Sequence, residues 1–144
     1  MNSAQLTALI TDLISQPTES EWVEFKENFH SAEEIGERIS ALANSACLCG
    51  QNYGYLIFGV KDQSHDIVGT SFKPKQQKAK GGEDLEHWLT TRLNPKADFK
   101  IDELHINAKH LVVFSIPAAY AQPVSFLHEE YIRVGSYTKK LKEY

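Results

Sequence analysis

The chain has 144 residues, of which 42% are hydrophobic and 24% charged, as expected for a soluble protein with a single core. Its formal net charge of -4 argues against a generally basic nucleic-acid-binding protein, although it allows a local basic patch. No apolar run approaches the roughly 18 residues that a membrane span needs, and no signal peptide is recognisable. Cys47 and Cys49 are the only cysteines and cannot form a disulfide framework, so we expect a reduced, cytoplasmic protein.

The first third of the chain predicts two amphipathic helices. Residues 3–16 place apolar side chains at three- and four-residue spacing, with Ser3 as the expected N-cap and Pro17 as the stop. The second helix begins at the capping-box pattern of residues 31–34 (Ser-Ala-Glu-Glu) and is expected to end between residues 46 and 50.

Between these helices, residues 19–26 (Glu-Ser-Glu-Trp-Val-Glu-Phe-Lys) predict a short strand. Because the side-chain period of a strand is two, Glu24 and Lys26 should project from one face. A second strand is expected at residues 55–60, and Asp62 follows it directly. If the two strands pair, then Glu19, Glu24, Asp62 and Lys26 converge on one edge of the sheet.

The rest of the chain adds one helix and several strands. Residues 72–82 lack an apolar period and predict an exposed, mobile, basic loop. A helix is expected at 83–93, with Leu85, Trp88 and Leu89 turned inward. Residues 111–116 are almost continuously apolar, which favours a central strand. Further strands are expected at 67–69, 99–106, 123–127 and 131–134. The order predicts an α+β fold, a mixed β-sheet with helices packed against it.

Several blocks of sequence together resemble the Schlafen AlbA-type domain. They are residues 24–26 (Glu-Phe-Lys), 39–44 (Ile-Ser-Ala-Leu-Ala-Asn), 56–62 (Leu-Ile-Phe-Gly-Val-Lys-Asp), 67–69 (Ile-Val-Gly) and 131–136 (Tyr-Ile-Arg-Val-Gly-Ser). The resemblance implies an Alba/Schlafen-like sandwich. It divides the chain into an N-terminal helix (1–18), the domain itself (19–137) and a basic C-terminal tail (138–144).

Two local features differ from what this resemblance or its older classification would imply. The helix-to-strand turn at 47–54 (Cys-Leu-Cys-Gly-Gln-Asn-Tyr-Gly) is longer than the compact Gly-Gly turn usual in the family. Some members were once grouped with divergent ATPases, but no G-x-x-x-x-G-K-[ST] motif is present here to cradle a nucleotide.

The resemblance implies, first, a nucleic-acid-binding domain that needs no cofactor, often part of a bacterial transcriptional regulator. Lysines and arginines on exposed segments attract phosphates independently of sequence, for DNA and RNA alike. The alternative for these residues is a solvated loop and tail. The candidate residues are Lys73, Lys75, Lys78, Lys80, Arg133, Lys139, Lys140 and, at the end of the tail, Lys142.

The resemblance implies, as an alternative, a metal-dependent endoribonuclease, because vertebrate Schlafen cores cleave structured RNA with three carboxylates. Glu19, Glu24 and Asp62 are similar to that triad and would bind Mg²⁺ or Mn²⁺, while Lys26 would stabilise the transition state. A second copy, hence a homodimer, would help to enclose the RNA. The plain alternative is that Glu24 pairs with Lys26, Glu19 is solvated and Asp62 starts a turn.

The remaining candidate residues give weaker indications of a function. Arg133 stands in an apolar strand and needs a partner, either Glu24, Asp62 or a phosphate. Tyr53, Tyr55 and Phe58 could stack on bases, or pack within the sheet. The scattered histidines and the two cysteines do not form a zinc motif. A protein-interaction module is the third class of function compatible with the acidic balance.

Overall fold

The computed structural model describes residues 1–16 and 20–144, so Glu19 lies outside the described residues. In chain order the elements are α1 (Ser3–Ile14), β1 (Val23–Lys26), α2 (Ala32–Leu48), β2 (Tyr53–Phe58), η1 (Lys80–Gly82), α3 (Leu85–Thr90), β3 (Leu93–Asn94), β4 (Lys100–Ile106), β5 (Lys109–Pro117), β6 (Ser125–Phe126), β7 (Glu129–Val134), β8 (Tyr137–Lys140) and η2 (Leu141–Glu143). Within the described ranges, none of the helices has the length and apolarity to cross a membrane.

The strands form two four-stranded sheets, which confirms the predicted α+β fold. The first sheet has the order β1-β2-β5-β4, with β1 parallel to β2 and the other pairs antiparallel. β5 is interior, as its apolar run predicted. The second sheet has the order β3-β6-β7-β8.

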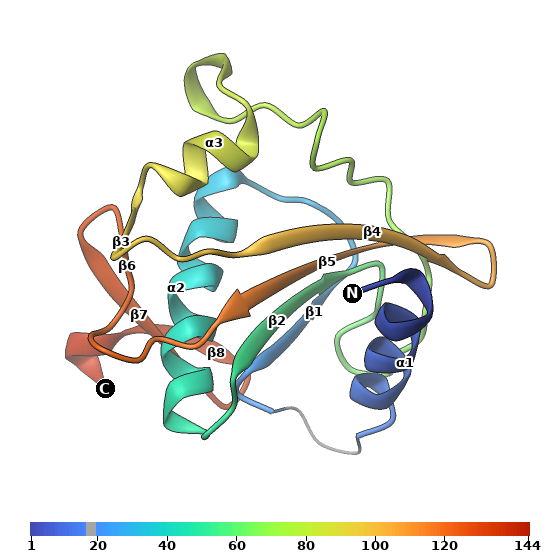
Figure 1. The fold of residues 1–144 in the computed structure, drawn as a ribbon, viewed down its shortest axis with the longest axis horizontal. Helices are drawn as coiled ribbons and strands as arrows, with labels where there is room; N and C mark the ends of the chain where they lie inside the picture. The colour runs from blue at the N-terminus through green and yellow to red at the C-terminus, as the bar shows by residue number, and fades with distance from the viewer. Residues whose placement is uncertain (17–19) are drawn as a thin grey trace.

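Helices α1 and α2 cover opposite faces of the first sheet (Figure 1). Leu56 and Phe58 pack in the core under α2, while Ile57 packs in a second core under α1 and Tyr55 lies against it. This alternation follows from the period of two along a strand. We call the two sides of the sheet the α2 face and the α1 face.

The helix ends follow the capping rules, with one shift. Ser31 accepts a hydrogen bond from the backbone N–H of Glu34 at 3.1 Å, so the predicted N-cap of α2 is confirmed. The N-cap of α1 is Asn2 and not Ser3, because Asn2 accepts from the N–H of Gln5 at 2.9 Å and the Gln5 side chain accepts from the N–H of Asn2 at 2.8 Å. This reciprocal pair begins the helix one residue earlier.

The basic loop is anchored to the core, which its sequence does not predict. Its lysines are exposed, but Phe72 is buried and its ring lies 5.1 Å from Phe29 and 4.7 Å from Phe58. A single large aromatic side chain leaves no periodic signal, although it ties the start of the loop to the core. Helix α3 is shorter than predicted because Leu93 pairs with Phe126 in the second sheet.

A polar stripe on α2 connects the helix to the second sheet. Ser40 donates to the carbonyl of Val124 at 2.7 Å and accepts from the N–H of Tyr131 at 3.0 Å. The side-chain amide of Asn44 donates to the carbonyl of Val124 at 3.0 Å and to the carbonyl of Tyr131 at 2.8 Å. Because these polar side chains are buried and satisfied, they fix β7 against α2.

Candidate functional site

Glu24 is the centre of a cluster of charged side chains on the α2 face. The residue is only 7% exposed, although it belongs to an edge strand. Its Oε2 lies 3.0 Å from Nε of Arg38 and 3.7 Å from Nζ of Lys26. Its Oε1 lies 3.6 Å from Nε of Arg133. Both carboxylate oxygens therefore face cations, which offset the cost of burying a charge.

Arg133 joins β7 to the chain around β1. The side chain is 2% exposed, and its Nη1 donates to the carbonyl of Ser20 at 3.1 Å and to the carbonyl of Val23. Its backbone N–H donates to Oγ of Ser45 at 2.9 Å, so α2 holds this part of β7 in place. The predicted ion pair between Arg133 and Glu24 is confirmed, while a phosphate contact by Arg133 stays a prediction.

Lys26 and Arg38 share a second carboxylate, Glu34. Nζ of Lys26 lies 3.1 Å from Oε1 of Glu34, and Nη2 of Arg38 lies 3.8 Å from Oε2 of Glu34. The predicted pairing of Glu24 with Lys26 is therefore confirmed as one contact of a larger network. Arg38 was not among the candidates from sequence. Its signal is the spacing of four residues from Glu34, which places both side chains on one side of α2.

A pocket of about 320 Å³ opens beside this cluster. The pairing of β1 with β2 brings Asp62 to the same pocket as Glu24 and Lys26, as the predicted strand pairing requires. Three carboxylates and three cations line it, so the charges balance. The lining residues are Glu24, Phe25, Lys26, Glu27, Arg38, Asp62, Arg133 and Ser136.

The predicted carboxylate triad stays a prediction, because Glu19 lies outside the described residues. In the ranges that the structure describes, no three His, Cys, Asp or Glu side chains are grouped as a metal site. The oxygens of Glu24 and the exposed Asp62 have the chemistry that Mg²⁺ or Mn²⁺ prefers. In the arrangement seen here, a cation would have to displace Lys26 or Arg38 from Glu24.

Asn28 fixes the start of the basic loop beside the end of β1. Its Oδ1 accepts hydrogen bonds from Oγ1 of Thr70 at 2.8 Å and from the backbone N–H of Ser71 at 3.1 Å. The carbonyl of Lys26 accepts from the N–H groups of Gly59 at 2.7 Å and Val60 at 3.2 Å, which brings the following turn to the same place. We call the lysines on or next to these joined segments, Lys26, Lys61, Lys73 and Lys75, the basic edge; Lys75 lies at its far end, beside α3.

The other predicted phosphate-binding lysines differ in how they are held. Lys78 forms an ion pair with Asp84 and thereby lowers the pKa of that carboxyl below its ordinary value. Lys140 lies 3.7 Å from Glu129, whereas Lys139 is exposed on β8. Lys73, Lys75 and Lys80 are exposed and form no ion pair with the described residues. These last three are the most available to an external anion.

Solved structures share this fold. The DIP2311 protein from Corynebacterium diphtheriae is 18% identical with a TM-score of 0.60, covering 96% of this chain and 26% of that protein. The N-terminal domain of an ATP-dependent DNA helicase RecG-related protein from Nitrosomonas europaea is 24% identical with a TM-score of 0.53, covering 95% of this chain and 92% of that one. The chain thus spans about a quarter of the Corynebacterium protein.

The sequence comparisons agree with the resemblance to the Schlafen AlbA-type domain that the sequence motifs indicate. No curated protein sequence matches the chain. The family model of the Schlafen, AlbA_2 domain matches residues 19–142, which include β1, α2, the basic loop and β7. The chain therefore belongs to the Schlafen AlbA_2 family.

Proposed function

We propose that this chain is a nucleic-acid-binding module that holds a phosphate backbone along the basic edge. The observation that carries the proposal is the contact of Asn28 with Thr70 and Ser71, because it holds the segment that leads into the loop lysines against the chain just after Lys26. Family membership supports the proposal, as does the fold shared with a domain named for a DNA helicase-related protein.

The charge distribution is compatible with this role. The formal net charge is -4, so phosphate attraction must be local and not a property of the whole surface. Lys73 and Lys75 are exposed and form no ion pair with described residues, so each can exchange counterions for a phosphate contact. Lys26, in contrast, is held by Glu24 and Glu34 and defines the inner end of the surface.

In its finer form, the proposal is a DNA-binding part of a cytoplasmic bacterial transcriptional regulator. The family resemblance supports this form. A second copy of the chain, forming a homodimer, would double the number of lysines presented to one duplex. The assay below distinguishes a preference for DNA from a preference for RNA by comparing duplexes of the same sequence.

The test is fluorescence anisotropy with labelled DNA and RNA over a series of salt concentrations. The double variant Lys73→Ala, Lys75→Ala is expected to bind all sequences more weakly, and the slope of log affinity against log salt should fall by about 1.4 to 1.8 for two lost contacts. The matched control is Lys96→Ala, Lys109→Ala, which removes two exposed lysines outside the basic edge and so changes the charge equally. An equal loss in both variants, or no loss in either, would refute the role of the basic edge.

A metal-dependent endoribonuclease is the second candidate, favoured because Glu24, Asp62 and Lys26 line one pocket. Two carboxylates could bind Mg²⁺ or Mn²⁺ and the lysine could stabilise charge on a phosphate. Asp62→Asn tests this cleanly, because Asp62 is exposed and outside the buried ion pairs. Cleavage of structured RNA that requires Mn²⁺ and is lost in Asp62→Asn would support the enzyme. Cleavage that is absent from the parent chain at every metal concentration would refute it.

A further inference from the structure

A hollow of about 540 Å³ lies on the α1 face, away from the charged pocket. Helix α1 packs on this face through Leu6, Ile10 and Leu13, and it leaves the end of β2 near Tyr53 uncovered. The hollow is lined by Met1, Tyr53, Tyr55, Asp98, Lys100, Asp102, Ser115 and Pro117.

The hollow results from one small residue in the middle of the sheet. Tyr55 on β2 and Lys100 on β4 both pair with Ser115 on β5, so the three residues form one row across the sheet. Neighbouring strands lie about 4.8 Å apart, so the backbones at Tyr55 and Lys100 are roughly 9.6 Å apart. With only a serine between two long side chains, the row leaves a slot that can admit a flat ring.

One side of the slot is aromatic. The rings of Tyr53 and Tyr55 lie 6.3 Å apart at 30°, and Trp22 meets Tyr55 edge-on at 6.2 Å. Tyr53 is 47% exposed, so its ring can stack on a ligand. Burial, and then the neighbouring Tyr53, raise the pKa of Tyr55 above its ordinary value.

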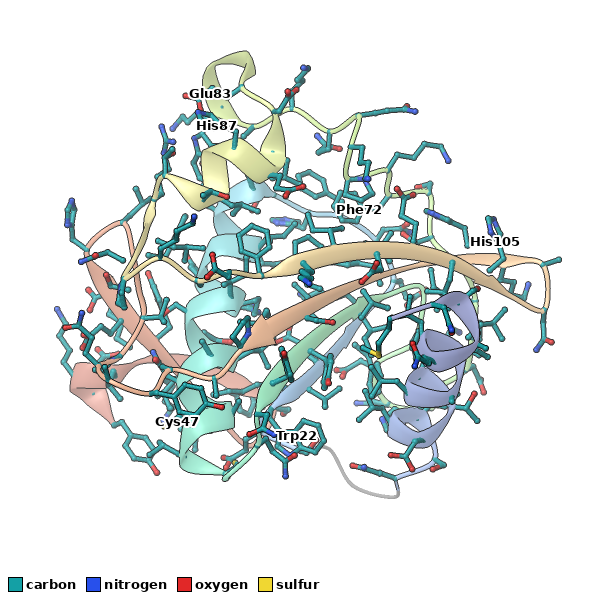
Figure 2. All side chains as sticks on the ribbon, viewed as in Figure 1. Trp22, Cys47, Phe72, Glu83, His87 and His105 are labelled. Carbon is teal, nitrogen blue, oxygen red and sulfur yellow. The ribbon has the colours of Figure 1, made fainter. Side chains whose placement is uncertain are left out.

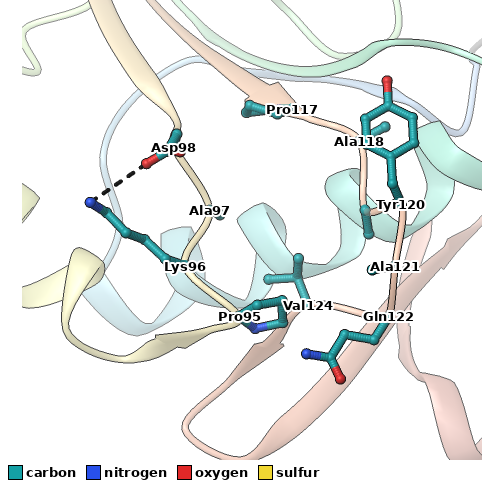
Figure 3. A pocket seen from close by; sticks show the side chains of 11 residues that line it. Pro95, Lys96, Ala97, Asp98, Pro117, Ala118, Tyr120, Ala121, Gln122 and Val124 are labelled. Atoms are coloured by element: carbon teal, nitrogen blue, oxygen red, sulfur yellow. Dashed lines mark ion pairs between the residues drawn. The ribbon is translucent and has the colours of Figure 1, made fainter.

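The other side of the slot offers a hydrogen-bond acceptor next to a donor. Asp98 is paired with Lys96 at 3.7 Å (Figure 3), whereas Asp102 forms no ion pair with the described residues. Lys100 lies two residues before Asp102 and therefore on the same face of β4. The floor holds Ser115, whose buried Oγ has no hydrogen-bond partner among the described residues.

We propose that this hollow binds a guanine ring, stacked on Tyr53 and Tyr55. The edge of guanine carries two N–H donors beside a carbonyl oxygen, which match the Asp102 carboxylate and the Lys100 ammonium group. Adenine lacks that pairing of donors and acceptor. The volume is within the range of small-molecule sites. The hollow in Figure 3, about 210 Å³, is lined largely by alanine and proline, and its aromatic residue, Tyr120, is 74% exposed.

The guanine site is separate from the basic edge and goes beyond the proposed function. Tyr55 is on the α1 face, whereas Glu24 and Arg38 meet on the α2 face. Trp22, beside the slot, and Phe72, under the basic loop, are well apart in Figure 2. Loss of guanine binding would therefore leave phosphate binding by the lysines intact. Loss of phosphate binding would likewise leave guanine binding intact.

The experiment is an NMR titration of the ¹⁵N-labelled chain with guanosine 5′-monophosphate and, separately, adenosine 5′-monophosphate. The two probes carry the same phosphate, so a difference between them reports the base. We expect guanosine monophosphate to bind at least 10-fold more tightly and to shift the resonances of Tyr53, Tyr55 and Ser115. Tyr53→Ala should weaken binding about 10-fold through lost stacking. Asp102→Asn should abolish the preference for guanine.

Tyr137→Ala is the matched control, because Tyr137 is 72% exposed on β8 and outside the hollow. A guanine-containing oligonucleotide distinguishes two sources of the ring. Tighter binding of the oligonucleotide through the same resonances identifies a base within a strand, and equal binding identifies a free nucleotide. Equal affinity for the two monophosphates, no binding of either, or equal effects of Tyr53→Ala and Tyr137→Ala would overturn the proposal.

Discussion

Replacing Glu24 by glutamine removes one charge from the centre of the buried cluster and keeps the shape of the side chain. The 2% exposed Arg133 would then lose its contact with the Glu24 carboxylate, and Arg38 would lose the closest of its three carboxylate contacts. Removing one partner of a buried ion pair leaves an uncompensated charge away from water. We therefore expect Glu24→Gln to destabilise the chain.

The expected loss in free energy of unfolding is about 3 kcal/mol, the lower end of the range of 3 to 5 for broken buried pairs. The lower end applies because the glutamine amide oxygen can still accept from Nε of Arg38, which now lies 3.0 Å from Glu24. For a chain of 144 residues, each kcal/mol lowers the melting temperature by about 3 to 4 °C. The melting temperature should thus fall by about 10 °C.

The measurement is a thermal melt followed by circular dichroism, with urea unfolding to obtain the free energy. Glu129→Gln is the matched control, because Glu129 pairs with Lys140 at 3.7 Å and Lys142 at 3.5 Å but is more exposed, at 26% of its side chain. It should cost less than about 1 kcal/mol. If Glu24→Gln melts within 3 °C of Glu129→Gln, or becomes more stable, then the Glu24 carboxylate stabilises the fold no more than an exposed ion pair does.

Two further predictions concern packing and pH. A Cβ atom at Gly36 would collide with the ring of Phe126, so Gly36→Ala should cost about 1 to 3 kcal/mol in urea unfolding despite the better helix propensity of alanine; unchanged stability would contradict this packing. The hydrogen bond from Lys78, and then its charge, lower the pKa of Asp84, so Lys78→Ala should return that pKa towards about 3.9 in a carboxyl NMR titration. Because the pKa is lowered in the folded chain, the stabilisation is present above about pH 4 and is lost as the pH falls through the lowered value. An unchanged Asp84 titration would exclude the contact.

The elements with regular patterns were predictable from sequence. The alternation of Val23 and Phe25 with Glu24 and Lys26 placed two side chains on each face of β1, and the structure has the first two in the core under α1 and the other two in an ion pair. The apolar run of β5 placed that strand inside the sheet. In both elements the local pattern and the burial agree, so the period alone was sufficient.

The residues that assemble the site were harder to predict, because their partners are distant in the sequence. Arg38 reaches Glu24 across 14 positions, and Asn28 reaches Thr70 across 42. The spacing of Arg38 from Glu34 indicates a pair on α2 but not the contact with Glu24, and both long-range contacts depend on which elements pack together. Phe72 illustrates the same limit for apolar residues, since one aromatic ring anchors a loop whose composition is that of an exposed segment.

The pairing of β1 with β2 explains why two sites can lie so close in sequence and yet on opposite sides of the sheet. Glu24 pairs in register with Leu56 and belongs to the α2 face, while Val23 pairs with Tyr55 and belongs to the α1 face. A shift of β1 by one residue against β2 would turn Glu24 towards the α1 face and Val23 towards the α2 face. The ion pairs of Glu24 with Arg38 and Arg133 oppose such a shift, because it would turn the Glu24 carboxylate away from both arginines. The charged cluster thus stabilises the register that keeps Lys26, and with it the inner end of the basic edge, on the α2 face.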